Sequence, residues 1–224
     1  MDAWDTDAMV TTTVHLLRHG EVHNPGRVLY GRLPGYHLSE RGHEMARVVA
    51  RALTDQGRDV VGLVASPLQR AQETAAPIAQ AFGLVTGTDE RLIEAGNRFE
   101  GTSVGSQPWR LLNPRWWPAL RNPRLPSWGE PYREQADRMQ AAVQDARIAH
   151  AGHEVVLVSH QLPIWVTRLA YEGARLWHDP RHRQCTLASL TSLHFADDVL
   201  AGIEYTEPAR RLSASLSKGA WSVK

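Results

Sequence analysis

The chain has 224 residues, 42% of them hydrophobic and 22% charged, which is enough apolar material for the core of one large globular domain. A formal net charge of +1 excludes the strong positive field of a non-specific nucleic-acid-binding protein. A single cysteine, Cys185, excludes a disulfide framework, and there is neither a signal-like N-terminus nor an apolar run of membrane length, so we expect a cytoplasmic protein.

The first predicted strand covers residues 14–17, after a flexible lead-in over residues 1–12. This apolar run is typical of a buried strand, and it ends in Arg18, His19 and Gly20. The glycine allows the backbone to turn sharply without a Cβ clash. Because open α/β sheets bind ligands at the carboxyl ends of their strands, a cation and an imidazole are expected at a ligand site.

Residues 20–38 form a long loop rich in glycine and proline. A loop of this length in a compact domain is usually functional. Ser39 is expected to cap a helix whose apolar face includes Met45 and Val49. A second buried strand is predicted over residues 60–65.

The next helix is predicted to start with Ser66 as its N-cap and Pro67 as its first residue, a position at which proline does no harm. It carries Arg70 in its first turns and is expected to end at Gly83. Pro77 lies inside it and predicts a kink or the loss of one hydrogen bond. The alternation of strands and helices favours a parallel sheet covered on both faces.

A short strand is predicted over residues 84–86, and Glu94 then follows an apolar pair. Residues 101–130 interrupt the alternation of strands and helices and are interpreted as an irregular excursion rich in proline, arginine and tryptophan. Its indoles are Trp109, Trp116, Trp117 and Trp128. They either pack the excursion itself or form the wall of a substrate pocket, and for any single one packing is the favoured role.

A polar helix is predicted over residues 130–150, with a buried side that includes Met139 and Val143. The buried strand predicted over residues 155–158 repeats the opening pattern, since it is followed by Ser159 and His160 and then by another helix.

Residues 187–195 and 200–205 are expected to form a closing hairpin. The tail over residues 207–224 is expected to be mobile. The predicted organisation is therefore a single domain over residues 13–206.

Four side chains stand at predicted strand ends or in the first turns of the following helices: Arg18, His19, Arg70 and His160. If the strands are parallel neighbours, all four face one pocket. Arginine binds phosphate through paired charge-assisted hydrogen bonds, and imidazole is a nucleophile that is neutral near pH 7. This combination indicates a phosphoryl-transfer centre without need of a metal.

The same residues belong to a wider pattern. Leu-Arg-His-Gly-Glu at residues 17–21, Leu-Ser-Glu-Arg-Gly at 38–42, Ser-Pro-Leu-Gln-Arg-Ala-Gln-Glu-Thr-Ala at 66–75 and Val-Ser-His-Gln at 158–161 run in the order of a known family. They resemble the phosphatase branch of the histidine phosphatase superfamily, the phosphoglycerate mutase-like proteins. The resemblance covers most of residues 13–172 and implies a three-layer α/β/α sandwich with a mostly parallel central sheet.

The resemblance implies a role for each matched position. His19 would attack phosphorus and become a phosphohistidine, while Arg18, Arg70 and His160 would hold the phosphoryl oxygens. Glu94 would protonate the leaving oxygen and then deprotonate the attacking water.

Three further residues, Asn24, Arg27 and Gly31, are candidates for contacts to phosphate or substrate, although Arg27 is equally consistent with a solvated loop charge. Some family members carry the acid directly after the second histidine. In this chain that position is Gln161, which returns the role to Glu94.

The spacing of glycines after Glu94 is about one residue shorter than in many family phosphatases, and segments typical of glycolytic mutases are not recognisable. We therefore expect a metal-independent phosphatase. A mutase-type phosphotransferase and a phosphate-binding protein with weak hydrolysis are the alternatives. The expected partner is a small phosphorylated metabolite, without nucleic acid, membrane, metal or cofactor, and a homodimer stays open.

Overall fold

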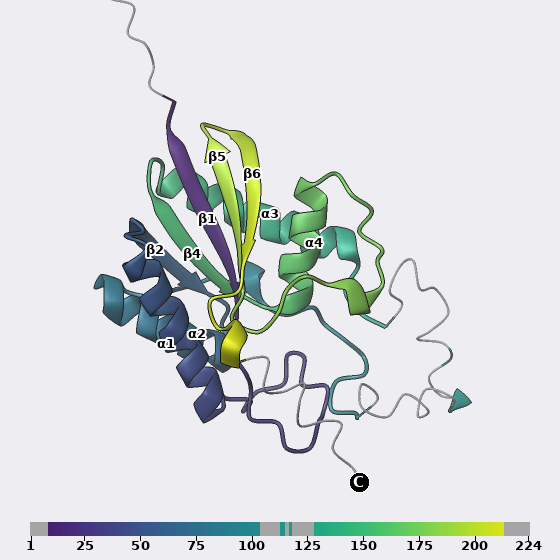
Figure 1. Ribbon diagram of the computed structural model, residues 1–224. Coiled ribbons are helices and arrows are strands. Elements are labelled where there is room, and N and C mark those ends of the chain that lie inside the picture. Colours follow the sequence, from purple (N-terminus) through teal and green to yellow (C-terminus); the bar gives the residue numbers. More distant parts are fainter. Residues whose placement is uncertain (1–8, 104–112, 115–116, 118–127, 213–224) are drawn as a thin grey trace, which may run out of the picture.

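The computed structural model describes residues 9–103, 113–114, 117 and 128–212 (Figure 1). The strands are β1 (Thr11–Arg18), β2 (Val60–Ala65), β3 (Gly87–Thr88), β4 (Glu154–Ser159), β5 (Leu190–Ala196) and β6 (Val199–Thr206). The α-helices are α1 (Glu40–Asp55), α2 (Gln69–Phe82), α3 (Tyr132–Ala149) and α4 (Gln161–Tyr171), and two short 3₁₀-helices are η1 (Glu90–Leu92) and η4 (Pro180–His182).

One six-stranded sheet has the order β3-β2-β4-β1-β5-β6. The strands β3, β2, β4 and β1 are parallel, whereas β5 pairs antiparallel with both β1 and β6. The prediction of a mostly parallel sheet with a closing hairpin is confirmed. Since β1 and β4 are the central pair, their continuous apolar runs are covered on both faces.

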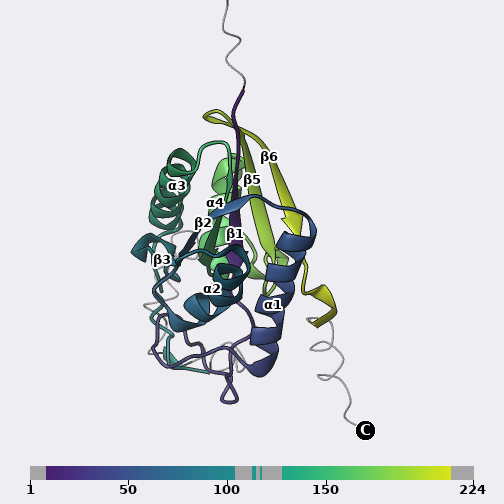
Figure 2. The same cartoon turned by 90° about the vertical axis from the view of Figure 1, so that its left-hand side faces the viewer.

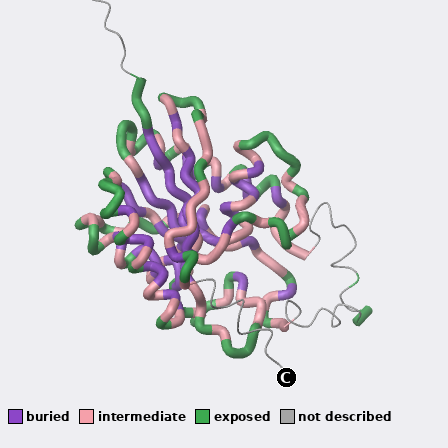
Figure 3. Tube along the Cα trace, in the orientation of Figure 1, coloured by how far each residue is buried: buried purple, intermediate pink, exposed green. Residues whose placement is uncertain are grey.

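Helices cover the sheet on both faces, with α1 and α2 on one side and α3 and α4 on the other (Figures 1 and 2). Successive side chains of a strand point to opposite faces. Accordingly, Leu17 packs in the cluster with Met45 of α1, and Leu16 packs in the cluster with Met139 of α3. The buried stretches in Figure 3 lie along the central strands and the helix faces against them. This is the predicted three-layer α/β/α sandwich.

Two predicted helix ends are confirmed by their caps. Ser39 accepts a hydrogen bond from the backbone N–H of Gly42 at 3.0 Å, which caps the start of α1. Gly83 adopts the left-handed conformation with φ of 67° and ends α2. Pro77 lies inside α2, and the helix continues through it.

The predicted start of α2 is wrong. The helix begins at Gln69 with Leu68 as its N-cap, so neither Ser66 nor Pro67 is part of it. The hydroxyl of Ser66 instead contacts a ring nitrogen of His160 at 2.8 Å. The Ser66 side chain therefore forms a tertiary contact, although the local sequence favours a place for it at the helix terminus.

Three further boundaries differ from the predictions. The strand β1 begins at Thr11, because its pairing with β5 continues to the pair Thr11 and Ala196, so residues 11–12 belong to the sheet. The short strand β3 lies at Gly87–Thr88, after the predicted position. The tail predicted to be mobile from residue 207 is described to Leu212, and there Ala209 is 2% exposed and packs in the core.

Trp109 and Trp116, on which part of the interpretation of the excursion rests, lie outside the described residues. Trp117 is 63% exposed, whereas Trp128 lines a cavity. In the part of the chain that the structure describes, no helix combines the length and apolarity needed to cross a membrane.

Candidate active site

The carboxyl ends of three neighbouring strands form the floor of the site. Arg18, the last residue of β1, pairs with Ser159 of β4, and Ala65 of β2 pairs with Val158. The backbone N–H of His19 donates to the Ser159 carbonyl at 3.1 Å. The register therefore brings the residues that follow each strand together, as the sequence predicts for parallel neighbours.

One ring nitrogen of His19 has a free lone pair. Its Nδ1 lies 2.8 Å from the carbonyl oxygen of Gly20. Because a carbonyl oxygen can only accept a hydrogen bond, Nδ1 carries the proton, and Nε2 keeps its lone pair. Burial, with the nearby charges of Arg70 and Arg18, lowers the pKa of His19 well below its usual value, so the ring is neutral.

Gly20 holds this geometry through close packing. A Cβ atom at this position would lie 2.7 Å from the carbonyl oxygen of Gly42, closer than real Cβ contacts allow. Its backbone N–H donates to the hydroxyl of Thr74 in α2 at 3.0 Å. The turn after β1 is thereby attached to the helix that carries Arg70.

The two arginines are oriented by backbone carbonyls. Arg18 donates through Nη1 to the Cys185 carbonyl at 2.6 Å, and Arg70, which is 1% exposed, donates through Nη2 to the Gly31 carbonyl at 2.7 Å. Within the described residues neither guanidinium forms an ion pair, and both Nε atoms are buried without a hydrogen-bond partner. Since a buried unpaired charge is costly, two such guanidiniums favour the binding of an anion.

His160 stands beside His19, with ring centroids 5.1 Å apart, and is fully buried. Its Nδ1 accepts a hydrogen bond from Arg70 Nη2 at 3.3 Å, so its Nε2 carries the proton and donates to Ser66 Oγ at 2.8 Å. Burial, followed by electrostatic interactions with the neighbouring His19 and with Arg70, lowers the pKa of His160 well below its usual value. The site thus combines two neutral imidazoles with two guanidiniums.

Glu94 faces the same space. It lines a cavity of about 240 Å³ together with Arg18, His19 and Tyr30, and its Oε1 accepts the backbone N–H of Ala95 at 2.9 Å. Burial raises the pKa of Glu94 above its usual value, against the opposing effects of the Ala95 hydrogen bond and the arginines. A raised pKa favours the protonated form of the carboxyl group, which is the form that a general acid needs.

Comparison with known proteins places this geometry in a family. The family model of the histidine phosphatase superfamily (branch 1) matches residues 14–206. This chain belongs to the histidine phosphatase superfamily.

Relatives in this superfamily cover most of the chain. Uncharacterized protein Rv0525 of Mycobacterium tuberculosis (strain ATCC 25618 / H37Rv) is 58% identical over 198 residues, spanning 88% of this chain and 97% of that protein. The protein named Probable phosphoglycerate mutase GpmB of Yersinia pestis (strain Pestoides F) is 33% identical over 160 residues, spanning 67% of this chain and 70% of that protein. The solved mycobacterial glucosyl-3-phosphoglycerate phosphatase Rv2419c matches with a TM-score of 0.67 and 26% identity, covering 88% of this chain and 96% of that one.

Not every predicted site residue lines this cavity. Arg70 and His160 do not line it, but they contact residues that do, Arg70 through the Gly31 carbonyl and His160 through the ring of His19. Gly31 lines it, with φ of 41°, and holds Arg70 through its carbonyl. Asn24 uses both ends of its side-chain amide on the backbone of Val28, so it shapes the loop, and it is not among the described residues that line the cavity. Arg27 is exposed in the same turn and does not line the cavity either.

Sequence reasoning missed three residues of the site. Ser66 was assigned to a helix cap, and no local pattern marks its contact with His160. Tyr30 lies with its ring 4.8 Å from the guanidinium carbon of Arg70. Its sequence signal is an aromatic residue inside a loop already interpreted as functional. Arg183 lines the cavity from an irregular segment after η4, where no periodicity identifies it.

We expect the free energy of unfolding to fall as the pH drops below about 6.5, the usual histidine pKa. Below this pH the unfolded chain binds protons on His19 and His160 that the folded protein, with lowered pKa values, does not bind. Each histidine contributes a slope of up to about 1.4 kcal/mol per pH unit, and the raised pKa of Glu94 offsets part of it. Urea unfolding between roughly pH 7.5 and 5.5 measures the slope.

The variant His19→Asn removes one of the two titrating rings and should give a flatter curve than the wild type. An unfolding free energy that stays constant over this pH range in the wild type would contradict the neutral state of both buried imidazoles.

Proposed function

We propose that this protein is a phosphatase that hydrolyses a phosphomonoester through a phosphohistidine intermediate on His19. One observation carries the proposal: His19, whose Nε2 is free, lines a cavity together with Arg18, and Arg70 contacts two residues that line it, Gly31 and Tyr30. Neither guanidinium has an ion pair among the described residues. The guanidinium group of arginine matches the geometry of phosphoryl oxygens. Two fixed guanidiniums also stabilise the charge that develops in the transition state of phosphoryl transfer.

In the proposed first step, Nε2 of His19 attacks phosphorus and the bond from phosphorus to the ester oxygen breaks. Glu94 transfers its proton to that oxygen, so the leaving group departs as a neutral alcohol. In the second step the Glu94 carboxylate takes a proton from a water molecule, and this water attacks the phosphohistidine. Inorganic phosphate is released, and His19 and the protonated Glu94 are restored.

His160 takes part in this scheme as a phosphate-binding group. In the structure both of its ring nitrogens are occupied, by Arg70 and by Ser66. The contact with Arg70 is the longer one, and a phosphoryl dianion attracts the guanidinium away from Nδ1. The same dianion favours a proton on the ring, so that Nδ1 can then donate to a phosphoryl oxygen.

Two observations support the hydrolase. Glu94 lines the cavity in spite of the shortened spacing that follows it, so a phosphate-binding protein without efficient hydrolysis is disfavoured. The solved mycobacterial glucosyl-3-phosphoglycerate phosphatase is 26% identical to this chain and matches 88% of it. A small phosphorylated metabolite is the proposed substrate.

The mutase-type alternative is retained because the Yersinia relative is 33% identical. A mutase returns the phosphoryl group to its substrate and depends on a bisphosphate primer. A phosphatase releases inorganic phosphate to water without such a primer.

Rapid-quench labelling tests the proposal. With 4-nitrophenyl phosphate as substrate, we expect mass spectrometry of the quenched protein to locate a phosphoryl group on His19, together with continued release of inorganic phosphate. We expect turnover to survive EDTA, because the guanidiniums supply the charge stabilisation. Turnover that leaves His19 unmodified at all quench times, or that depends strictly on added metal, would overturn this mechanism.

A further inference from the structure

Gln161 lies in the active-site cavity, and neither step of the proposed mechanism uses it. It is the first residue of α4 and follows His160 directly. It lines the cavity together with His19 and Glu94, and its side chain is only partly buried. An amide in this position is therefore within reach of molecules that enter the cavity.

The orientation of the Gln161 amide is set by a backbone carbonyl. Its Nε2 donates a hydrogen bond to the carbonyl oxygen of Cys185 at 3.2 Å. Because a carbonyl oxygen can only accept, the NH₂ end of the amide faces Cys185, and Oε1 points away from it. Among the described residues, no group donates a hydrogen bond to Oε1. The side chain therefore supplies the cavity with an unused hydrogen-bond acceptor.

The same carbonyl places the amide beside the site of phosphoryl transfer. Arg18 also donates to the Cys185 oxygen, through Nη1 at 2.6 Å. Two donors on one oxygen lie close together, so the Gln161 amide is a neighbour of the guanidinium that stabilises the phosphoryl group. Glu94 lines the same cavity, and its Oε1 accepts the backbone N–H of Ala95.

A water molecule that attacks phosphorus needs partners for two hydrogen atoms. One is taken by Glu94, and a well-held water requires at least one further polar partner. The guanidiniums of the cavity have no acceptor atom, and Asn97 Oδ1 already accepts the N–H of Phe99 at 2.9 Å. The remaining side-chain acceptors that line the cavity are Gln161 and Tyr30. The phenol oxygen is the poorer acceptor, because its lone pair is delocalised into the ring.

We propose that Gln161 is a catalytic residue of the second step, in which its Oε1 accepts a hydrogen bond from the water molecule that attacks the phosphohistidine. The water oxygen forms a bond to phosphorus as the bond from phosphorus to Nε2 of His19 breaks. One proton moves to Glu94, and the other stays on the new inorganic phosphate. This inference rests on the proposed function, because it starts from the phosphohistidine, and it gives Gln161 no part in the first step.

Gln161→Met tests the inference, because methionine has a similar length and only a weak acceptor. Rapid-quench labelling with 4-nitrophenyl phosphate measures both steps. We expect phosphohistidine to form at a rate within about 3-fold of the wild type, and its hydrolysis to slow roughly 10-fold to 100-fold because the water is misplaced. Gln80→Met makes the same change at an exposed position of α2 and should behave as the wild type.

Added methanol separates water binding from a general effect on the site. An alcohol has one O–H hydrogen, which goes to Glu94, so its attack does not need the acceptor on Gln161. The ratio of methyl phosphate to inorganic phosphate should therefore be roughly 10-fold higher in Gln161→Met than in the wild type. A merely structural change would slow the attack of both molecules alike and leave this ratio unchanged.

A first step slowed as much as the second would show that Gln161 acts through Arg18 or through the fold, and an unchanged ratio would show that it does not bind the water. Either result overturns the inference, as does a raised ratio in Tyr30→Phe but not in Gln161→Met. Circular dichroism checks folding, and Gln161→Ala replaces the methionine variant if that protein is unfolded.

The wild type separates this inference from the proposed function. If no phosphohistidine forms in the wild type, the proposed function fails and the inference fails with it. If the phosphohistidine forms and Gln161→Met hydrolyses it at the wild-type rate, only the inference fails.

Discussion

Replacing His19 by asparagine is expected to lower kcat for 4-nitrophenyl phosphate by roughly 10⁴-fold or more, because the variant has no ring nitrogen to attack phosphorus. The asparagine amide can still donate to the Gly20 carbonyl, as Nδ1 does in the wild type. The arginines remain in place, so phosphate should still bind. Steady-state kinetics with thermal unfolding as a check on folding measures the effect.

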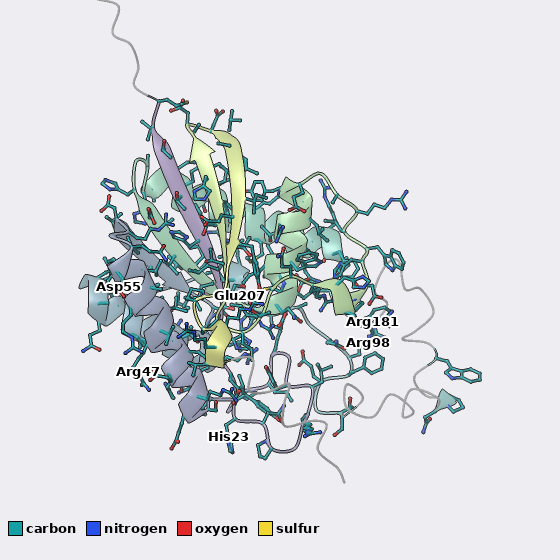
Figure 4. The ribbon with its side chains drawn as sticks, in the orientation of Figure 1. His23, Arg47, Asp55, Arg98, Arg181 and Glu207 are labelled. Atoms are coloured by element: carbon teal, nitrogen blue, oxygen red, sulfur yellow. The ribbon has the colours of Figure 1, made fainter. Side chains whose placement is uncertain are left out.

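His23→Asn is the matched control, since it makes the same chemical change four residues later. His23 is exposed on the loop after β1, as Figure 4 shows, and does not line the cavity. Its variant should retain full activity. A His19→Asn protein that is folded and keeps activity within about 10-fold of the wild type would exclude His19 as the nucleophile.

Glu94→Gln should show the second large effect, and its size should depend on the leaving group. Without a proton donor, kcat for an alkyl phosphate is expected to fall roughly 10²-fold to 10⁴-fold. Nitrophenolate leaves without protonation, so for 4-nitrophenyl phosphate the first step should persist. The second step still lacks its base, and the phosphohistidine should accumulate. Glutamine keeps an oxygen that can accept the Ala95 N–H, so the change is local.

The pH dependence gives an independent measure of the same residue. In the proposed first step Glu94 must carry its proton, and its raised pKa extends the protonated form to higher pH than in an ordinary glutamate. The value of kcat/KM for an alkyl phosphate should therefore decline as the pH rises through the pKa of Glu94, and this decline should disappear in Glu94→Gln. The exposed Glu90→Gln serves as the control. A first step slowed equally for both leaving groups, with no accumulation of phosphohistidine, would exclude Glu94 from the proton-transfer role.

The core of the site follows from two apolar runs in the sequence. Residues 14–17 and 155–158 contain almost no polar side chains, which indicates strands buried on both faces of a parallel sheet. Such strands lie side by side at the centre, and their carboxyl ends meet at one edge. The meeting of His19 and His160, with ring centroids 5.1 Å apart, was therefore predictable although the two are far apart in the chain.

Other parts of the site depend on contacts that no local pattern encodes. Serine before proline is typical of a helix start, but the Ser66 hydroxyl binds His160, which is 94 residues away. Asn24 has the chemistry of a phosphate donor, yet the backbone of Val28 occupies its amide. Arg183 comes from a segment without regular structure, and only its position in space shows that it lines the cavity.

Both arginines of the site donate hydrogen bonds to backbone oxygens, Arg18 to that of Cys185 and Arg70 to that of Gly31. Every amino acid contributes such an oxygen, so natural variation can exchange the residue at 185 for another small one without loosening Arg18. An insertion or deletion between η4 and β5 would instead displace the oxygen itself. Selection on this part of the molecule should therefore act more strongly on the number of residues than on their identity.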